Sequence, residues 1–207
     1  NATGLELAGT ALGRLGWAVG AVENAGGGTS WRKDAYGRLE YKLGGMRLDG
    51  LHAEASGAAW QERSLSLGAS TWRGRAGIYK AGSHLYDEDF LRVGADLHAV
   101  FDDFLVDVVA VRQRHTPRSS DAAGQTLDLL YTELTWMATA AFFPTARLEA
   151  AQLAHHDKKD TRWLATLQGT AVLRANVLLR LVADVGAESD GHGAEFRSVV
   201  AAFSTAF

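Results

Sequence analysis

The sequence contains no cysteine, and this absence removes several kinds of chemistry at once. A chain without thiols forms no disulfide, binds no metal through thiolates, attaches no c-type haem covalently and offers no cysteine nucleophile. The absence does not assign a cellular compartment, because many exported proteins also lack cysteine.

Proline is scarce, with 2 residues, whereas glycine is abundant, with 23. This composition favours many strands joined by turns over helices with proline near their ends. Long hydrophobic runs are missing too. Although 47% of the residues are hydrophobic, the longest apolar stretches fall far short of the roughly 18 to 20 residues that a membrane-spanning helix needs. The sequence therefore does not predict a helical membrane protein.

The formal net charge is -3, so no basic excess points to a nucleic-acid partner. A length of 207 residues predicts one domain, 1-207, or a large piece of one. The first residues, Asn1-Ala2-Thr3-Gly4, have neither the basic start nor the apolar core of a signal peptide. If the protein is exported, we therefore expect this sequence to be a mature chain or to lack an N-terminal portion.

Apolar and polar residues alternate with a period of two along most of the chain. Leu179, Leu181 and Val185 share one face of a segment whose opposite face carries Arg180 and Asp184. The pattern predicts strands at about 4-12, 15-24, 34-44, 62-75, 89-101, 103-115, 126-141, 145-156, 161-174, 176-189 and 196-207. Because Thr132 and Gln152 fall on the apolar face of their segments, we expect a β-bulge there that shifts the phase.

The predicted connections alternate in length. Short turns are expected near Gly13-Arg14, Asp102, Pro144 and Ala175, and longer polar loops near 25-33, 76-88, 116-125, 157-160 and 190-195. Outer-membrane barrels have the same asymmetry, with tight periplasmic turns and longer external loops. The connection at 45-61 is an exception, because it is long but falls on the short-turn side.

Strands of roughly 10 to 14 residues exceed the soluble mode of about 5 to 6 and match the length that a tilted membrane-crossing strand needs. One face is rich in Leu, Val and Ala, and the other carries charges of both signs. The sequence therefore predicts an all-β fold: an antiparallel up-and-down transmembrane β-barrel with about 11 strands in this chain, forming part of a larger barrel. A soluble antiparallel sandwich is the alternative, because it alternates as well.

The last segment, Phe196-Arg-Ser-Val-Val-Ala-Ala-Phe-Ser-Thr-Ala-Phe207, resembles the C-terminal signature strand that the barrel assembly machinery reads in outer-membrane proteins. The segments 16-22, 36-45 and 169-180 are similar to the C-terminal half of outer-membrane porin-like proteins, including porins that accompany multihaem cytochromes. The resemblance implies a bacterial outer-membrane location and an assembly signal at Phe203 and Phe207. It also implies outer-membrane lipid, the assembly machinery and further barrel strands or a multihaem cytochrome as partners. The odd number of strands departs from the family pattern.

The phase of the alternation predicts which charged residues would line a pore. They are Glu6, Arg38, Glu40, Lys42, Arg92, Asp96, His98, Asp107, Arg147, Glu149, Arg162, Arg174, Arg180, Asp184 and Glu188. We expect a channel for small polar solutes, or a sheath that encloses an electron-transfer cytochrome, and no enzymatic activity. The plainer interpretation is that these charges form cross-strand ion pairs in the barrel interior.

Two other functions are possible on this sequence. An outer-membrane hydrolase could use His115, Ser119, Ser120 and Asp121, but no Gly-x-Ser-x-Gly motif supports it. A structural or adhesive barrel with a plugged lumen would bind through the loops at 76-88 and 116-125. No cofactor or metal site is expected, because the adjacent residues of the run 155-157, His-His-Asp, point to opposite faces of a strand.

Aromatic residues lie mostly near the predicted strand ends, where the rings of a membrane barrel form girdles at the two interfaces. The set is Trp17, Tyr41, Trp72, Trp136, Phe142, Phe143, Trp163 and Phe207. Packing in an ordinary protein core is the alternative role for these rings.

Overall fold

The computed structural model describes residues 3-23, 33-49, 63-80, 82-119, 122-155, 158-174, 177-189 and 194-205. These residues form one antiparallel sheet of 11 strands. They contain no helix with the length and hydropathy needed to cross a membrane. The strands are β1 Thr3–Ala11, β2 Leu15–Glu23, β3 Lys33–Gly44, β4 Ser64–Lys80, β5 Ser83–Phe101, β6 Phe104–Pro117, β7 Gln125–Trp136, β8 Phe142–His155, β9 Lys158–Arg174, β10 Val177–Ser189 and β11 Ala194–Thr205.

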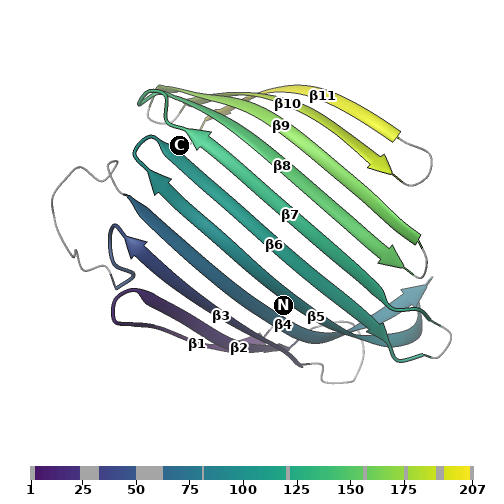
Figure 1. Cartoon of the computed structure of the whole chain (residues 1–207). Coiled ribbons are helices and arrows are strands. Elements are labelled where there is room, and N and C mark those ends of the chain that lie inside the picture. The colour runs from purple at the N-terminus through teal and green to yellow at the C-terminus, as the bar shows by residue number, and fades with distance from the viewer. Residues whose placement is uncertain are drawn as a thin grey trace.

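Each strand pairs with its neighbours in the chain, so the order in the sheet is the order in the sequence. Figure 1 shows the sheet curving across its width from β1 to β11. Among the described residues, β1 pairs only with β2 and β11 only with β10, which leaves the curved sheet open between its two edges. The predicted all-β, up-and-down antiparallel fold is confirmed, and an open curved sheet is compatible with part of a barrel.

Tight turns connect β1 to β2 and β5 to β6 at one end of the sheet. Leu12 and Gly13 both have positive φ, at 55° and 66°, in the turn between β1 and β2. Asp102 has a φ of 49° between β5 and β6. Single residues in the left-handed region are typical of tight hairpins, so the turns predicted near Gly13-Arg14 and Asp102 are confirmed. Ala175-Asn176 lies outside the described residues, between β9 and β10.

Two predicted loops are wrong. Most of 76-88 belongs to the β4–β5 hairpin, in which Ala76 pairs with Glu88 and Ile78 with Tyr86. Residues 158-160 belong to β9, so the predicted loop at 157-160 is largely strand. Both segments were assigned to loops because they are polar. Their charges lie instead on strand ends that extend past the apolar part of the sheet.

The turn predicted near Pro144 is also misplaced. β7 ends at Trp136, the connection covers 137-141, and Pro144 lies within β8. Proline is tolerated there because β7 pairs with β8 only as far as Thr145, so no β7 carbonyl needs a donor from Pro144.

The expected β-bulge near Thr132 and Gln152 is absent, since the register of β7 with β8 is continuous through both residues. Both stay on the apolar face, and the Gln152 amide donates to the Thr161 hydroxyl at 3.3 Å. Register shifts occur elsewhere among the described strands, between Ile78 and Tyr79 and between Val177 and Leu178.

The two faces of the sheet differ sharply. We call the face of Arg38, Asp96 and Asp184 the charged face and the opposite one the apolar face. Among the described residues Ala99 is the one buried hydrophobic residue, so the sheet has no second layer packed against it in this part of the chain. The buried polar residues all follow the phase of the charged face: Asp34, Ser64, Ser66, Thr145 and Thr166. Because side chains crowd on the inner side of a curved sheet, we identify the charged face as the concave one.

Candidate functional site

The register of the strands gathers the predicted charged residues on one face, because directly paired residues of an antiparallel sheet lie on the same side. One row crosses the sheet from β3 to β10 and is polar at every position. It consists of Lys42, Ser66, His98, Asp107, Glu133, Arg147, Thr166 and Asp184. Such a row forms only if polar residues occupy the same side of the alternation in all eight consecutive strands.

Side chains within this row bind one another. His98 Nδ1 lies 2.6 Å from Asp107 Oδ1, and the Thr166 hydroxyl donates to Asp184 at 2.7 Å. Arg147 bridges to Thr166 at 3.5 Å and pairs with Glu149 at 3.0 Å. The row is therefore a belt of mixed charge across the concave face, hydrogen-bonded between His98 and Asp107 and from Arg147 through Thr166 to Asp184.

Arg38 forms the strongest ion pair of the charged face. Its two terminal nitrogens bind both oxygens of Asp96 at 2.7 and 2.8 Å, and Glu40 lies at 3.5 Å. This pair spans β3 to β5 across the intervening β4 residue Gly68, which is the register partner of Asp96. A Cβ at Gly68 would collide with the Asp96 carboxylate. The glycine thus makes room for a bidentate pair, which is the most directional form of ion pair.

A second polar group lies on the charged face closer to the strand ends that oppose the tight turns. Tyr36 donates to Glu6 and stacks on Trp72 with the ring centroids 5.2 Å apart. Trp72 Nε1 in turn donates to Asp34 at 3.4 Å. The prediction that Trp72 belongs to a girdle on the apolar face is therefore wrong. By its pairing with Thr170, Phe143 also lies on the charged face.

The remaining predicted site residues divide into two groups. Arg92 donates to Gln113 at 2.7 Å on the charged face, and Arg162 and Arg180 occupy the same face by register. Arg174 and Glu188 lie in β9 and β10, and Phe203 pairs with Leu179, but the side chains of these three are outside the described part of the structure. Phe207 lies outside the described residues altogether.

Several polar residues that were not in the predicted pore-lining set share the charged face. His115 Nδ1 contacts Glu88 Oε1 at 2.6 Å, and Tyr131 donates to Glu133 at 2.6 Å. These residues follow the same period-two alternation as the predicted charged residues. Glu88 lies outside the predicted strand 89-101, in a segment whose polar composition predicts a loop. Tyr131 and Glu133 flank Thr132, where the expected bulge would have shifted the phase.

The charged face also carries an unexpected apolar patch, which we call the inner apolar patch. It spans β6 to β9 and consists of Val109, Val111, Leu127, Leu129, Ala151, Leu153 and Leu164. Leu129 is 41% exposed and Leu153 37% exposed. Part of the patch lines an open hollow of about 500 Å³, with Tyr131 and Arg162 at its border.

The opposite, apolar face presents large hydrophobic side chains to the surroundings. Leu39 is 56% exposed, Leu148 48%, Leu167 64% and Leu181 55%. At the tight-turn end of this face, Phe104 stacks on Trp136 with 6.2 Å between the ring centroids. Exposed apolar area of this extent marks a surface that meets another apolar phase or partner.

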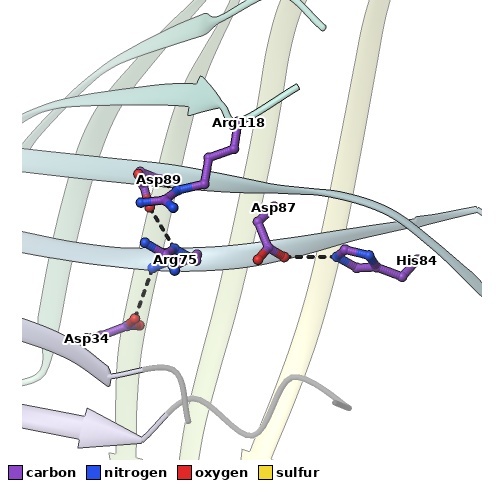
Figure 2. Close-up of polar contacts among 6 residues, drawn as sticks. All are labelled: Asp34, Arg75, His84, Asp87, Asp89 and Arg118. Carbon is purple, nitrogen blue, oxygen red and sulfur yellow. Dashed lines mark hydrogen bonds and ion pairs between the residues drawn. The ribbon is translucent and has the colours of Figure 1, made fainter. Parts of the chain in front are cut away.

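At the other end of the sheet the apolar face becomes charged. Figure 2 shows Asp89 between two arginines: Arg75 Nε donates to one carboxylate oxygen at 2.8 Å and Arg118 Nε to the other at 3.0 Å. From the charged face, the Asp34 carboxylate accepts a hydrogen bond from the backbone N-H of Arg75 at 3.2 Å. His84 contacts Asp87 at 2.9 Å. The hydrogen bond from Arg75 holds the pKa of Asp89 below its ordinary value, against an opposing effect of desolvation and with further help from Arg118.

Within the described ranges, no three His, Asp or Glu side chains converge closely enough to hold a metal ion. Ser119 belongs to the described part of the chain, whereas Ser120, Asp121, His156 and Asp157 do not.

In comparisons with known proteins, no family model matches this chain and no curated protein matches it.

Proposed function

We propose that this chain forms part of an outer-membrane β-barrel that acts as a porin-like channel or sheath. In this proposal the apolar face contacts lipid and the charged face lines a water-filled lumen. The observation that carries it is the separation of the side chains: exposed Leu, Val and aromatic residues on one face, and hydrogen-bonded charges on the other. A soluble sheet would bury its apolar face against a second layer.

Strand length supports the proposal. The shortest described strands have 9 residues and the longest has 19, and a tilted strand needs about 9 to 11 residues to cross a bilayer. In β5 the apolar face runs from Leu91 to Phe101, and Asp89 lies beyond it. The longer strands therefore extend past the proposed membrane into water.

The open edges of the sheet also bear on the proposal. Backbone groups of β1 and β11 that lack a neighbouring strand would be unpaired in lipid, and each unpaired group costs several kcal/mol. We therefore propose that further strands complete the cylinder. An eleven-stranded sheet would then form one wall of a larger barrel.

Fluorescence quenching tests the placement of the two faces. Two variants of the full-length protein, one retaining only Trp136 and the other only Trp72, are folded into vesicles of brominated phosphatidylcholine. Trp136 lies on the apolar face and is 47% exposed, so bromine should quench it strongly, whereas Trp72 should be quenched far less. Equal quenching of the two would contradict the proposal, as would a protein that stays folded and soluble without detergent.

Single-channel recording tests the pore. Asp96→Asn should shift the reversal potential of the channel toward anion selectivity and Arg38→Gln toward cation selectivity, because each leaves one charge of the pair uncompensated beside the ions. Asp89→Asn is the control, because Asp89 lies on the other face. A bilayer that contains folded protein but does not conduct would rule out the open channel.

The inner apolar patch favours the second candidate, a sheath that encloses a partner protein such as an electron-transfer cytochrome. A water-filled pore has no need of exposed Val and Leu side chains, whereas a protein inside the barrel would cover them. Haem absorbance that co-purifies with the barrel, and is lost on Leu129→Asp with the barrel still folded, would support the sheath. A haem-free preparation that conducts would support the channel.

A further inference from the structure

The apolar face ends in a band of basic residues at the strand ends opposite the tight turns. We call this band the basic rim, and its residues are Arg73, Arg75, Arg112, Arg114 and Lys159. The register fixes their side: Arg73 pairs with Leu91, and Leu91 pairs with Arg114. Leu91 is 45% exposed on the apolar face, so the two flanking arginines point outward with it. They lie two strands apart, which corresponds to roughly 10 Å.

Acidic residues neutralise only part of the rim. Arg112 forms a bidentate pair with Asp128 at 2.6 and 2.9 Å, yet the Arg112 side chain is 67% exposed. Asp89 serves both Arg75 and Arg118, as Figure 2 shows. Basic groups therefore outnumber acidic ones on this face among the described residues, and the excess positive charge lies directly above exposed leucines.

The tight-turn end of the same face has a different character. Phe101, Phe104 and Trp136 occupy it, each at least 44% exposed, and the nearby Asp102 forms an exposed pair with Arg63. Aromatic rings suit either interface of a bilayer, whereas a row of guanidinium groups suits an interface that is rich in anions. The two rims are therefore built for different headgroup layers.

We propose that the basic rim binds the phosphate groups of a phosphorylated glycolipid in the leaflet that it contacts. This inference rests on the proposed membrane location of the apolar face. The long stems of Arg and Lys can lie along acyl chains while their charged groups reach the headgroup layer. A guanidinium binds a phosphate through two parallel hydrogen bonds. The phosphates in turn reduce the repulsion among Arg73, Arg112 and Arg114.

Thermal unfolding in defined vesicles tests the proposal. The full-length protein is folded into phosphatidylcholine vesicles with and without diphosphoryl lipid A. For the wild type we expect lipid A to raise Tm by several degrees, and we expect high salt to reduce this shift. In the variant Arg73→Gln/Arg114→Gln/Lys159→Gln most of the shift should be lost.

The chain offers a matched control, because neighbouring strand residues point to opposite faces. The variant Arg92→Gln/Lys158→Gln/Arg162→Gln removes the same formal charge from the charged face, and its lipid A shift should equal that of the wild type. A rim variant that keeps the full shift overturns the proposal. So does an equal shift with dephosphorylated lipid A. If the wild-type protein does not insert into plain phosphatidylcholine, the membrane location itself fails, and this outcome is distinct from a missing lipid A effect.

Discussion

The charged and apolar faces differ in where their side chains find partners. On the charged face the partners come from the chain itself, as in the pairs Arg38–Asp96 and His98–Asp107. On the apolar face Leu148 and Leu167 have no covering layer among the described residues. Because a slip of one residue would exchange the two faces, every hairpin must hold its register for this separation to exist. The comparison shows that the charged side chains find partners within the fold, whereas the large hydrophobic side chains of the apolar face stay uncovered among the described residues.

The largest expected effect comes from placing a charge on the apolar face. On the proposed membrane location, Leu167→Arg should destabilise the protein in a bilayer by about 2 to 4 kcal/mol, because the guanidinium would face hydrocarbon. Gln168→Arg, at the next position on the charged face, should change the free energy of unfolding much less. Urea unfolding in lipid vesicles measures both. Equal losses at the two positions would abolish the distinction between the faces.

A pair of glycine substitutions compares how crowded the two faces are. Gly68→Ala on the charged face should cost about 1 to 3 kcal/mol, because the new methyl group meets the Asp96 carboxylate. Gly37→Ala on the apolar face meets nothing closer than 3.8 Å and should be neutral, or stabilising by about 0.4 to 1 kcal/mol. Urea unfolding in lipid vesicles measures both changes in the free energy of unfolding. A larger loss for Gly37→Ala than for Gly68→Ala would indicate that the apolar face is the concave one.

The smallest expected effect is the loss in acid of the stability that Asp89 contributes at the charged end of the apolar face. Because Arg75 lowers the folded-state pKa of Asp89, this carboxylate stabilises the fold above its ordinary pKa of 3.8. The contribution is lost as the pH falls through the lowered folded-state value. Asp89→Asn should therefore be slightly less stable than the wild type at pH 7, and the difference should vanish in strong acid. Urea unfolding of the two proteins across this pH range measures the difference, and a difference that persists in strong acid would contradict the prediction.

Periodicity was sufficient to predict the all-β antiparallel fold, because a period of two is a direct consequence of strand geometry. It did not predict where the strands end. The segments 76-80 and 83-88 have the composition of a loop, and only the cross-strand pairs, such as Ala76 with Glu88, reveal them as strand. The inner apolar patch was missed for another reason. Leu129 and Leu153 interrupt the polar phase of their strands, so each looks like an irregularity until the register brings them together.

The protruding β4–β5 hairpin has a practical use. Gly82 at its tip has a φ of 84° and no heavy atom within 4 Å of the position that a Cβ would occupy, and the adjoining Ser83 and His84 are exposed. Loop tips of this kind tolerate inserted sequence. On the proposed membrane location, a short epitope inserted after Gly82 would label one side of the membrane, so antibody staining of intact cells would report the orientation of the protein.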